Sequence, residues 1–304
     1  MRRSIPDPSA ALVPHSGTYN GAFGDGFSLP QRHCHTIVCA LAGVLLATAA
    51  RAQDVANPTD SKPACTLEAV GTASVRRVID GRTVVLADGR ELKLAGIETP
   101  QVNAAGAQTA RAQAAKSALE ALIADRVLTL KRLGAGTDRY GRVVAHAFVA
   151  QASTPDIWLQ QALVAQGHAR VAAKVGDPGC ATALLAAEKA ARIARLGLWA
   201  DPYYVMRRAE APAEVLAERG HFTLVEGRVL SVRESSGTIY VNFGRRWSED
   251  FTVTVARRSE KAFAAAGLEL RKLAGRTVRV RGHVEERGGP WIEASAPEQI
   301  EIAE

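Results

Sequence analysis

Alternation of apolar and polar residues, interrupted by two Asp-Gly turns, constrains the fold of this chain more than any other feature. Val, Thr and Leu are frequent in residues 69–94, and the pattern breaks at Asp80-Gly81 and again at Asp88-Gly89. Asp-Gly between alternating runs is typical of a tight turn that joins two antiparallel strands. We therefore expect three strands in this segment, connected by two turns.

Helices and further strands follow in an order that predicts an α+β domain, mainly β. Residues 104–125 are rich in Ala and place Leu119, Leu122 and Ile123 near helical spacing, which indicates an amphipathic helix. The last helix of this domain is expected to end at Gly197, because glycine is frequent just after a helix. The pattern predicts strands at residues 126–133 and 142–150 and helices at 156–167 and 180–196.

The length of 304 residues favours two domains, since a domain contains roughly 100 to 200 residues. Residues 205–220 are charged and contain Pro212, so we interpret them as a linker between a first domain at 70–204 and a second at 221–304. A helix expected at 259–266 separates the third and fourth of five strands, which suggests a second small β-barrel of the oligonucleotide-binding (OB) type. These strands are expected at residues 222–232, 238–243, 251–255, 277–285 and 291–294.

The apolar segment 36–50 predicts export. Arg32 precedes it, and a small-x-small pattern ending at Ala52 follows it, so we expect a signal peptide cleaved before Gln53 and a periplasmic or secreted protein. A membrane anchor is the alternative, although the segment is shorter than the ~20 residues that span a bilayer.

The leader is expected to comprise residues 1–52. Residues 1–31 lack apolar periodicity, and we expect translation to start downstream of Met1. Residues 53–69 are polar at their start and contain two prolines, so we interpret them as a linker. No membrane span is expected in the mature chain.

Two of the four cysteines, Cys65 and Cys180, remain after the expected cleavage. An even pair in an oxidising compartment predicts a disulfide, and two separate thiols are the alternative. Closing so long a loop stabilises a fold by about 4 to 5 kcal/mol in the chain-entropy model.

The chain is basic, with 38 Lys and Arg against 31 Asp and Glu and a net charge of +7. Such a balance weakly favours an anionic partner, such as nucleic acid, phosphate or a membrane surface. Aromatic residues make up only 5% of the chain, a low value for a protein that binds single strands over long aromatic surfaces.

Four segments carry a resemblance to a known family: Val-Ile-Asp-Gly-Arg-Thr-Val at 78–84, Leu-Lys-Leu-Ala-Gly-Ile-Glu-Thr-Pro-Gln at 92–101, Thr-Asp-Arg-Tyr-Gly-Arg at 137–142 and Gly-Leu-Trp at 197–199. In this order and spacing they resemble the staphylococcal nuclease (thermonuclease) family over about residues 70–199. The resemblance implies a five-stranded OB-type barrel with three helices. In active members it also implies calcium-dependent hydrolysis of DNA and RNA.

The resemblance implies roles for individual positions, and several of them hold altered residues. Arg82 stands where the family has a calcium-ligating aspartate, and Lys93 stands where it has an arginine that grips phosphate. Glu98 stands where the family has its second aspartate ligand, and Thr99 stands where it has a threonine. Gln101 replaces the glutamate that activates water, and an amide cannot accept a proton near neutral pH.

Arg142 matches the arginine of the family's Tyr-Gly-Arg segment and is unchanged. Our first hypothesis is therefore a pseudonuclease, in which Lys93, Arg142 and Arg82 bind phosphate by charge while hydrolysis is lost. We expect no cofactor in that case.

Two alternatives stay open. The site could be a rebuilt one with weak metal-dependent nuclease activity, in which Asp80, Glu98 and the Thr99 carbonyl bind calcium or another divalent ion. Asp138 and Arg142 could instead only brace the barrel. At the level of the whole protein, the sequence favours an exported thermonuclease-like protein that binds nucleic acid or another polyanion, and a protein-interaction module of the cell envelope is the alternative.

The second domain interleaves basic and aromatic residues, a mixture that suits a single nucleic-acid strand. Strand alternation places Tyr240 and Asn242 on one face and Val241 and Phe243 on the other, so about half of the aromatic residues must lie in the core. The alternative is therefore a structural or protein-binding role. The residues concerned are Arg245, Arg246, Arg257, Arg258, Arg279, Arg281, Arg287, Tyr240, Phe243, Trp247, Phe251 and Trp291.

Overall fold

A computed structural model of the chain describes residues 65–101, 107–132 and 136–303. The expected signal peptide and most of the first expected linker lie outside these residues. No helix among the described residues has both the length and the apolar character that a membrane span requires.

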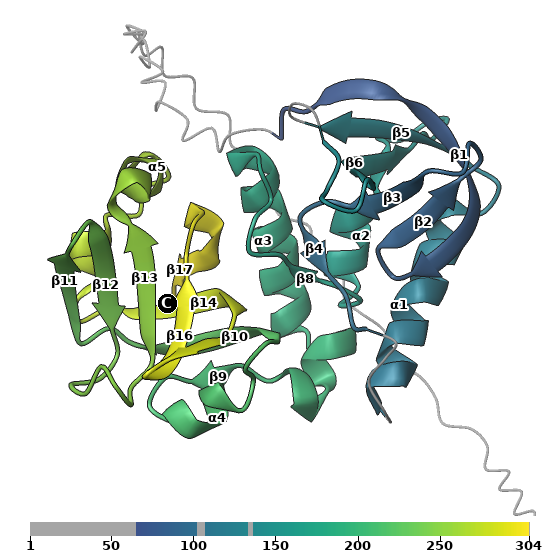
Figure 1. Cartoon of the computed structure of the whole chain (residues 1–304). Coiled ribbons are helices and arrows are strands. Elements are labelled where there is room, and N and C mark those ends of the chain that lie inside the picture. Colours follow the sequence, from purple (N-terminus) through teal and green to yellow (C-terminus); the bar gives the residue numbers. More distant parts are fainter. Residues whose placement is uncertain (1–64, 102–106, 133–135, 304) are drawn as a thin grey trace, which may run out of the picture. The chain divides into compact units, whose positions relative to one another are not determined.

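Five strands in the first half of the structure close into a barrel (Figure 1). Their order is β3, β2, β1, β5 and β6, and a parallel pairing between β3 and β6 closes the ring. The two Asp-Gly turns join β1 to β2 and β2 to β3, so the three strands predicted there are confirmed. The short strand β7 extends the sheet beside β6, while β4 and β8 pair with each other. The strands are β1 (Glu68–Asp80), β2 (Thr83–Leu86), β3 (Glu91–Leu94), β4 (Ile97–Glu98), β5 (Val127–Arg132), β6 (Val143–Val149), β7 (Ile157–Trp158) and β8 (Arg170–Val171).

Three helices pack on this barrel: α1 (Ala107–Ile123), α2 (Leu159–Ala165) and α3 (Pro178–Ile193). Each contributes a fully buried leucine to one apolar core, namely Leu119, Leu163 and Leu184. The barrel supplies strand residues such as Leu92 and Leu128 to the same core. The predicted α+β fold with a five-stranded barrel and three helices is therefore confirmed.

The predicted end of α3 is wrong. The helix ends at Ile193, and Arg195 adopts the left-handed backbone conformation, with φ of 53°. The Leu196 N–H then donates to the Ala191 carbonyl at 2.9 Å, which is the bonding of a helix C-terminus. Gly197 serves a close approach instead, because an added Cβ would lie 2.3 Å from the Gly167 carbonyl oxygen.

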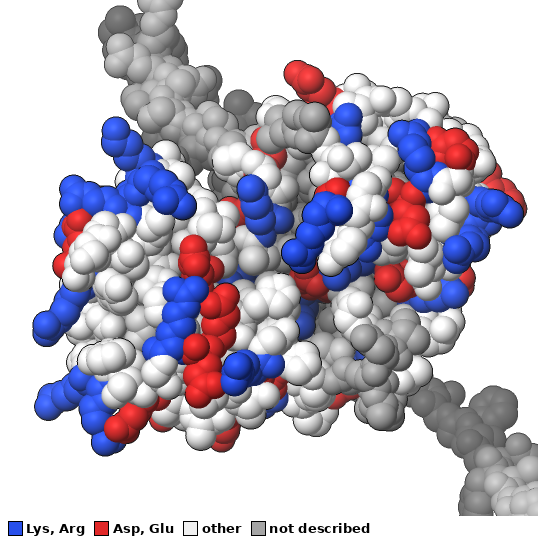
Figure 2. Space-filling view, in the orientation of Figure 1, with Lys and Arg blue, Asp and Glu red and all other residues white. Residues whose placement is uncertain are grey.

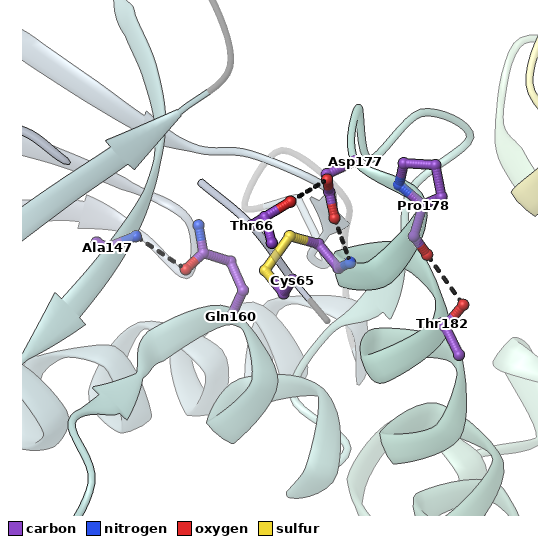
Figure 3. The surroundings of a disulfide bond; sticks show 8 residues. Cys65, Thr66, Ala147, Gln160, Asp177, Pro178 and Thr182 are labelled. Carbon is purple, nitrogen blue, oxygen red and sulfur yellow. Dashed lines mark hydrogen bonds between the residues drawn. A yellow bond between two sulfur atoms is a disulfide. The ribbon is translucent and has the colours of Figure 1, made fainter. Parts of the chain in front are cut away.

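A disulfide between Cys65 and Cys180 joins the start of the described chain to α3 (Figure 3). The predicted pairing is therefore confirmed. Asp177 lies beside it at the helix N-terminus, where its Oδ1 accepts the Cys180 N–H at 2.8 Å. The other carboxylate oxygen of Asp177 accepts the Thr66 hydroxyl at 3.4 Å, so the first residues of the barrel are fixed to the helix in two ways.

The second half of the structure contains two sheets around one apolar core. Four strands pair in the order β17, β14, β10 and β9, and five pair in the order β11, β12, β13, β16 and β15. The strands are β9 (Arg207–Arg208), β10 (Phe222–Arg228), β11 (Ser231–Ser235), β12 (Thr238–Asn242), β13 (Thr252–Ala256), β14 (Thr277–His283), β15 (Glu285–Arg287), β16 (Gly289–Glu293) and β17 (Ile300–Ile302). The helices are α4 (Pro212–Leu216) and α5 (Glu260–Ala265), with short 3₁₀ helices at Gly197–Ala200, Pro202–Tyr204, Arg257–Ser259, Leu270–Leu273 and Pro297–Gln299.

A second closed barrel is not confirmed. The five expected strands and the helix after the third are present, but the chain bends between β10 and β11 and between β14 and β15, and the pairings divide into two sheets. The expected linker at 205–220 is also structured. It contains β9, which pairs with β10 in parallel, and α4, whose Val215 is fully buried.

A buried ion pair connects the two halves. Arg281 of β14 and Glu188 of α3 are both fully buried, and their side chains form two hydrogen bonds of 3.1 and 2.7 Å. Arg281 also donates to the Val171 carbonyl at 3.0 Å and contacts Glu301. Burial opposes charge on Glu188, but Arg281 outweighs it and holds the pKa of this carboxyl below its ordinary value.

Candidate functional site

The altered family positions meet at one end of the first barrel. Arg82 lies in the turn between β1 and β2, and Lys93 lies on β3 opposite Thr83. Glu98 ends β4, and Arg142 directly precedes β6. The turn is fixed to β3 because the Leu94 N–H donates to the Arg82 carbonyl at 2.8 Å. Sequence positions separated by up to sixty residues therefore form one cluster.

Arg82 is bonded to its neighbours on several sides. Its guanidinium forms a salt bridge with Glu98, and Nη1 donates to the Ile97 carbonyl at 3.1 Å. Its backbone N–H donates to Oδ1 of Asp80 at 2.9 Å. Both side chains of the salt bridge are at most one-fifth exposed, so water screens the pair only weakly. Of the two candidate carboxylate ligands, Glu98 is thus paired with a cation and Asp80 is bonded to a backbone N–H.

Gln101 and Thr99 are bonded to each other. The Gln101 amide Nε2 donates to the Thr99 carbonyl at 3.1 Å. That carbonyl is the oxygen that a rebuilt metal site would use, and it faces an N–H group here. The Thr99 hydroxyl is buried and has no hydrogen-bond partner among the described residues.

Lys93 is the cation of the cluster that has no salt bridge with any described residue. Burial lowers the pKa of its ammonium group, and the positive charges of Arg82 and Arg142 lower it further. The carboxylates of Glu98 and Asp138 oppose this effect without cancelling it. An anion that arrived beside Lys93 would relieve the repulsion among the three cations.

Arg142 is held by Asp138. Its Nε and Nη2 lie 2.8 and 2.7 Å from Oδ2 of Asp138, and the other carboxylate oxygen accepts the N–H groups of Tyr140 and Arg142. Although desolvation opposes it, this hydrogen bonding lowers the pKa of the Asp138 carboxyl. Tyr140 is 70% exposed, and the Arg142 guanidinium lies 5.2 Å from its ring centre. Asp138 therefore orients the arginine within this loop.

The donor set does not fit calcium. A calcium ion needs about six to eight oxygen ligands, several of them anionic. Asp80 accepts a backbone N–H, Glu98 is paired with a guanidinium, and the Thr99 carbonyl accepts an amide N–H. Elsewhere in the described chain, three ligand atoms of His, Cys, Asp or Glu come together only at Cys65, Asp177 and Cys180, where the two sulfurs are bonded to each other.

A pocket of about 460 Å³ lies next to the cluster and is lined from both halves of the structure. Arg82, Glu98 and Gln101 line one side of it. Arg170 lines it too; its guanidinium donates to the Phe222 carbonyl at 3.0 Å, and burial lowers its pKa. No local pattern indicates Arg170, because its partner lies 52 positions away along the chain.

The basic residues expected to bind nucleic acid in the second half separate into two groups. Arg279 and Arg281 form salt bridges with Glu226 and Glu188 and are at most 13% exposed. Phe251 is fully buried in the core. Basic and acidic side chains are interspersed on the face shown in Figure 2, so a continuous basic surface is not present there. Of the remaining group, Arg245 and Arg287 line a groove that is described below, whereas Arg246, Arg257 and Arg258 do not.

Comparison with protein-family models matches residues 91–201 to the family described as staphylococcal nuclease homologue. The closed five-stranded barrel agrees with this match. Residues 91–201 therefore lie in a staphylococcal nuclease-like domain. Family members of this kind are metal-dependent nucleases, and their domains bind nucleic acid. The match excludes Arg82, which lies in the preceding turn. No curated protein matches the chain.

Proposed function

We propose that this staphylococcal nuclease homologue binds nucleic acid or another polyanion without hydrolysing it. The phosphate-binding cluster, which we define as Arg82, Lys93 and Arg142, supplies the positive charge. The proposal includes no catalytic role, because Gln101 cannot act as the base. The site also lacks free ligands for a metal ion that could activate water.

The salt bridge between Arg82 and Glu98 is the observation that carries the proposal. A metal ion would have to displace a guanidinium from the most suitable carboxylate left at the site. Like charges at such short range repel strongly, so the exchange is unfavourable for any divalent cation. The same guanidinium favours a phosphate oxygen.

Lys93 supports anion binding. It has no acidic partner in a salt bridge among the described residues, and burial, with the positive charges of Arg82 and Arg142, lowers the pKa of its ammonium group. A phosphate would compensate these charges and raise the pKa of the ammonium group again. Arg142, positioned by Asp138, offers its remaining N–H groups to the same ligand.

We also propose that the protein acts outside the cytoplasm, in the periplasm or after secretion. The disulfide between Cys65 and Cys180 supports this location, since such bonds persist in oxidising compartments. The signal-peptide pattern at residues 36–52 supports it independently.

Fluorescence anisotropy with an abasic oligodeoxynucleotide tests the proposed function, because this probe carries phosphates but no bases. We expect affinity to fall steeply with salt, and Lys93→Ala should reduce the magnitude of the slope of log K against log salt by about 0.7. Lys174→Ala is the matched control, since Lys174 is an exposed lysine in the same half of the structure. Equal effects of the two variants, or salt-independent binding, would contradict the proposal. Metal-dependent cleavage that is lost in Arg142→Ala would support a weak nuclease instead.

A further inference from the structure

An open groove crosses the five-stranded sheet of the second half. Its volume is about 800 Å³, within the range of roughly 300 to 1,000 Å³ that ligand sites have. The strands β11, β12, β13, β15 and β16 and the loop between β12 and β13 form it. We call it the arginine–aromatic groove after six of its lining residues: Arg233, Arg245, Arg287, Tyr240, Trp247 and Trp291.

The charge of the groove is of one sign. Three arginines line it, and none of the described lining residues is Asp or Glu. Arg233 and Arg245 are exposed, and neither forms a salt bridge with a described residue. Arg287 pairs with Glu285 at 3.0 Å, outside the lining, and its guanidinium lies 3.9 Å from the centre of the Trp291 ring. The groove therefore favours an anionic ligand.

The aromatic side chains offer flat surfaces to that ligand. Trp247 is 73% exposed, an unusual state for so large an apolar side chain. Tyr240 points outward because its neighbours Ile239 and Val241 fill the core on the opposite face of β12. Packing in the core therefore does not explain why aromatic side chains stand at positions 247 and 240.

The loop that carries Trp247 is fixed. Oδ2 of Asp250 accepts the Arg246 N–H at 2.7 Å, and the Asp250 N–H donates to the Arg246 carbonyl at 2.8 Å. The loop packs closely against Gly289, where an added Cβ would lie 2.8 Å from the Asp250 carbonyl oxygen. Less conformational entropy is lost when a ligand meets a fixed aromatic ring.

We infer that the arginine–aromatic groove binds single-stranded nucleic acid, with bases stacked on Trp247, Tyr240 and the Arg287–Trp291 pair and phosphates bound by Arg233 and Arg245. Stacking needs base faces that a duplex hides, and arginines without acidic neighbours need phosphates. A neutral glycan would use the aromatic rings but leave the cations without partners. The inference goes beyond the proposed function, because it uses a second site that shares no residue with the phosphate-binding cluster.

The test compares two labelled probes of about 12 nucleotides, oligo(dT) and the abasic strand of equal charge. Full-length protein should bind oligo(dT) more tightly. Trp247→Ala should weaken oligo(dT) binding by about 5- to 150-fold and leave abasic binding unchanged, whereas Trp247→Phe should retain most of the preference. Since Trp247 is exposed, these variants should keep the thermal stability of the parent protein.

Charge is tested separately. The double variant Arg233→Ala/Arg245→Ala should reduce the magnitude of the salt slope by about 1.4, whereas Arg258→Ala, which removes an exposed arginine outside the groove, should leave it nearly unchanged. Equal affinity for both probes, or an unchanged oligo(dT) affinity in Trp247→Ala, would overturn the inference. Failure of the proposed function is distinct, because in that case Lys93→Ala would have no effect while the preference for oligo(dT) persists.

Discussion

At the scale of the residue, Arg82 changes the chemistry of the nuclease-like site most. Its guanidinium pairs with Glu98, one of the carboxylates that a metal ion would need, and in our proposal it favours an anion instead. Gln101 adds to the change because its amide bonds the Thr99 carbonyl. Both substitutions act through hydrogen bonds that the structure describes, so their effects should be reversible by substitution.

We expect Arg82→Asp, Lys93→Arg and Gln101→Glu, made together, to create calcium-dependent hydrolysis of single-stranded DNA. The base alone contributes about 100- to 10,000-fold in rate when it is placed correctly. A gel assay with labelled DNA measures the rate, and adding Arg142→Ala should abolish it. If the combined variant binds calcium but does not cut, the barrel no longer has the geometry for hydrolysis.

His146 predicts a dependence of stability on pH. This side chain lies on β6 and is 2% exposed, and burial lowers its pKa from 6.5 to about 4, partly offset by a hydrogen bond to the backbone of Val175 and by Asp177. His146 therefore takes up a proton near pH 6.5 in the unfolded chain but only near pH 4 in the folded chain. Because the unfolded chain binds more protons between these values, the free energy of unfolding falls as the pH falls through this range.

Urea unfolding at pH 7.5 and pH 5 measures this effect. The parent protein should lose about 2 kcal/mol more than His146→Phe does over this interval, because the variant has no imidazole to protonate. Other carboxylates and histidines titrate in both proteins and cancel in the comparison. Parallel losses would show that His146 is protonated equally in both states.

At the scale of the element, α3 fixes several parts of the first half to one another. Pro178 starts the helix, Asp177 caps it, and Cys180 joins it to the first described residue of the chain (Figure 3). The covalent bond closes a loop across 115 positions, worth about 4 to 5 kcal/mol in the chain-entropy model. The hydrogen bonds of Asp177 fix the same junction without a covalent bond.

Asp177→Ala should destabilise the protein by about 1 kcal/mol, within a range of roughly 0.5 to 2, because the Cys180 N–H loses its acceptor. Asp177→Asn keeps an acceptor oxygen and should retain most of the stability. Urea unfolding of disulfide-intact protein at neutral pH measures both. Equal losses in the two variants would indicate that the charge of Asp177, not its capping bond, stabilises the helix.

The elements that the sequence predicts well are those with local signals. The Asp-Gly turns place β1, β2 and β3 correctly, and Ala-rich helical spacing places α1. The predicted end of α3 is wrong because Gly197 does not end the helix. It lies against Gly167, a residue distant from it in the sequence. The charge and the proline of residues 205–220 predict a linker, but β9 pairs with β10 there and α4 packs against β9 and β16.

The sequence predicts which residues form the candidate site, but not the salt bridges and hydrogen bonds between them. Resemblance to the family indicated Arg82, Lys93 and Arg142, whereas the salt bridge between Arg82 and Glu98 depends on how β4 lies beside the turn. For the groove, the sequence predicts only a mixture of basic and aromatic residues in the second domain. Strand alternation separated Tyr240 from the core, but no local pattern distinguishes its arginines from those buried in ion pairs.

At the scale of the whole molecule, the buried pair of Arg281 and Glu188 connects the two halves. Removing two charges from water is costly, and further hydrogen bonds from the backbone of Val171 and the side chain of Glu301 offset part of that cost. Nε of Arg281 is buried and has no hydrogen-bond partner among the described residues. The opposite charges hold the pKa of Arg281 above its ordinary value despite burial. Charge compensation therefore extends across the two halves, in addition to the pairs that Glu188 forms with Arg192 and Arg281 forms with Glu301.

Arg281→Met should cost about 3 to 5 kcal/mol, because it leaves Glu188 buried without its main partner. In a double-mutant cycle with Glu188→Leu, the double variant should be more stable than the sum of the single losses predicts by about 1 to 3 kcal/mol. Arg258→Met controls for loss of an exposed arginine. Additive losses, or separate unfolding of the two halves in the parent protein, would contradict this coupling.

If the nuclease-like site cannot assemble a metal-bound hydroxide, the parent protein should not cleave nucleic acid, and a cleavage assay measures this. Purified, disulfide-intact parent protein is incubated with labelled single-stranded DNA and with RNA in the presence of calcium, magnesium or manganese. We expect the DNA and the RNA to remain intact with every metal. Cleaved product that requires a metal ion and disappears in Arg142→Ala would contradict it.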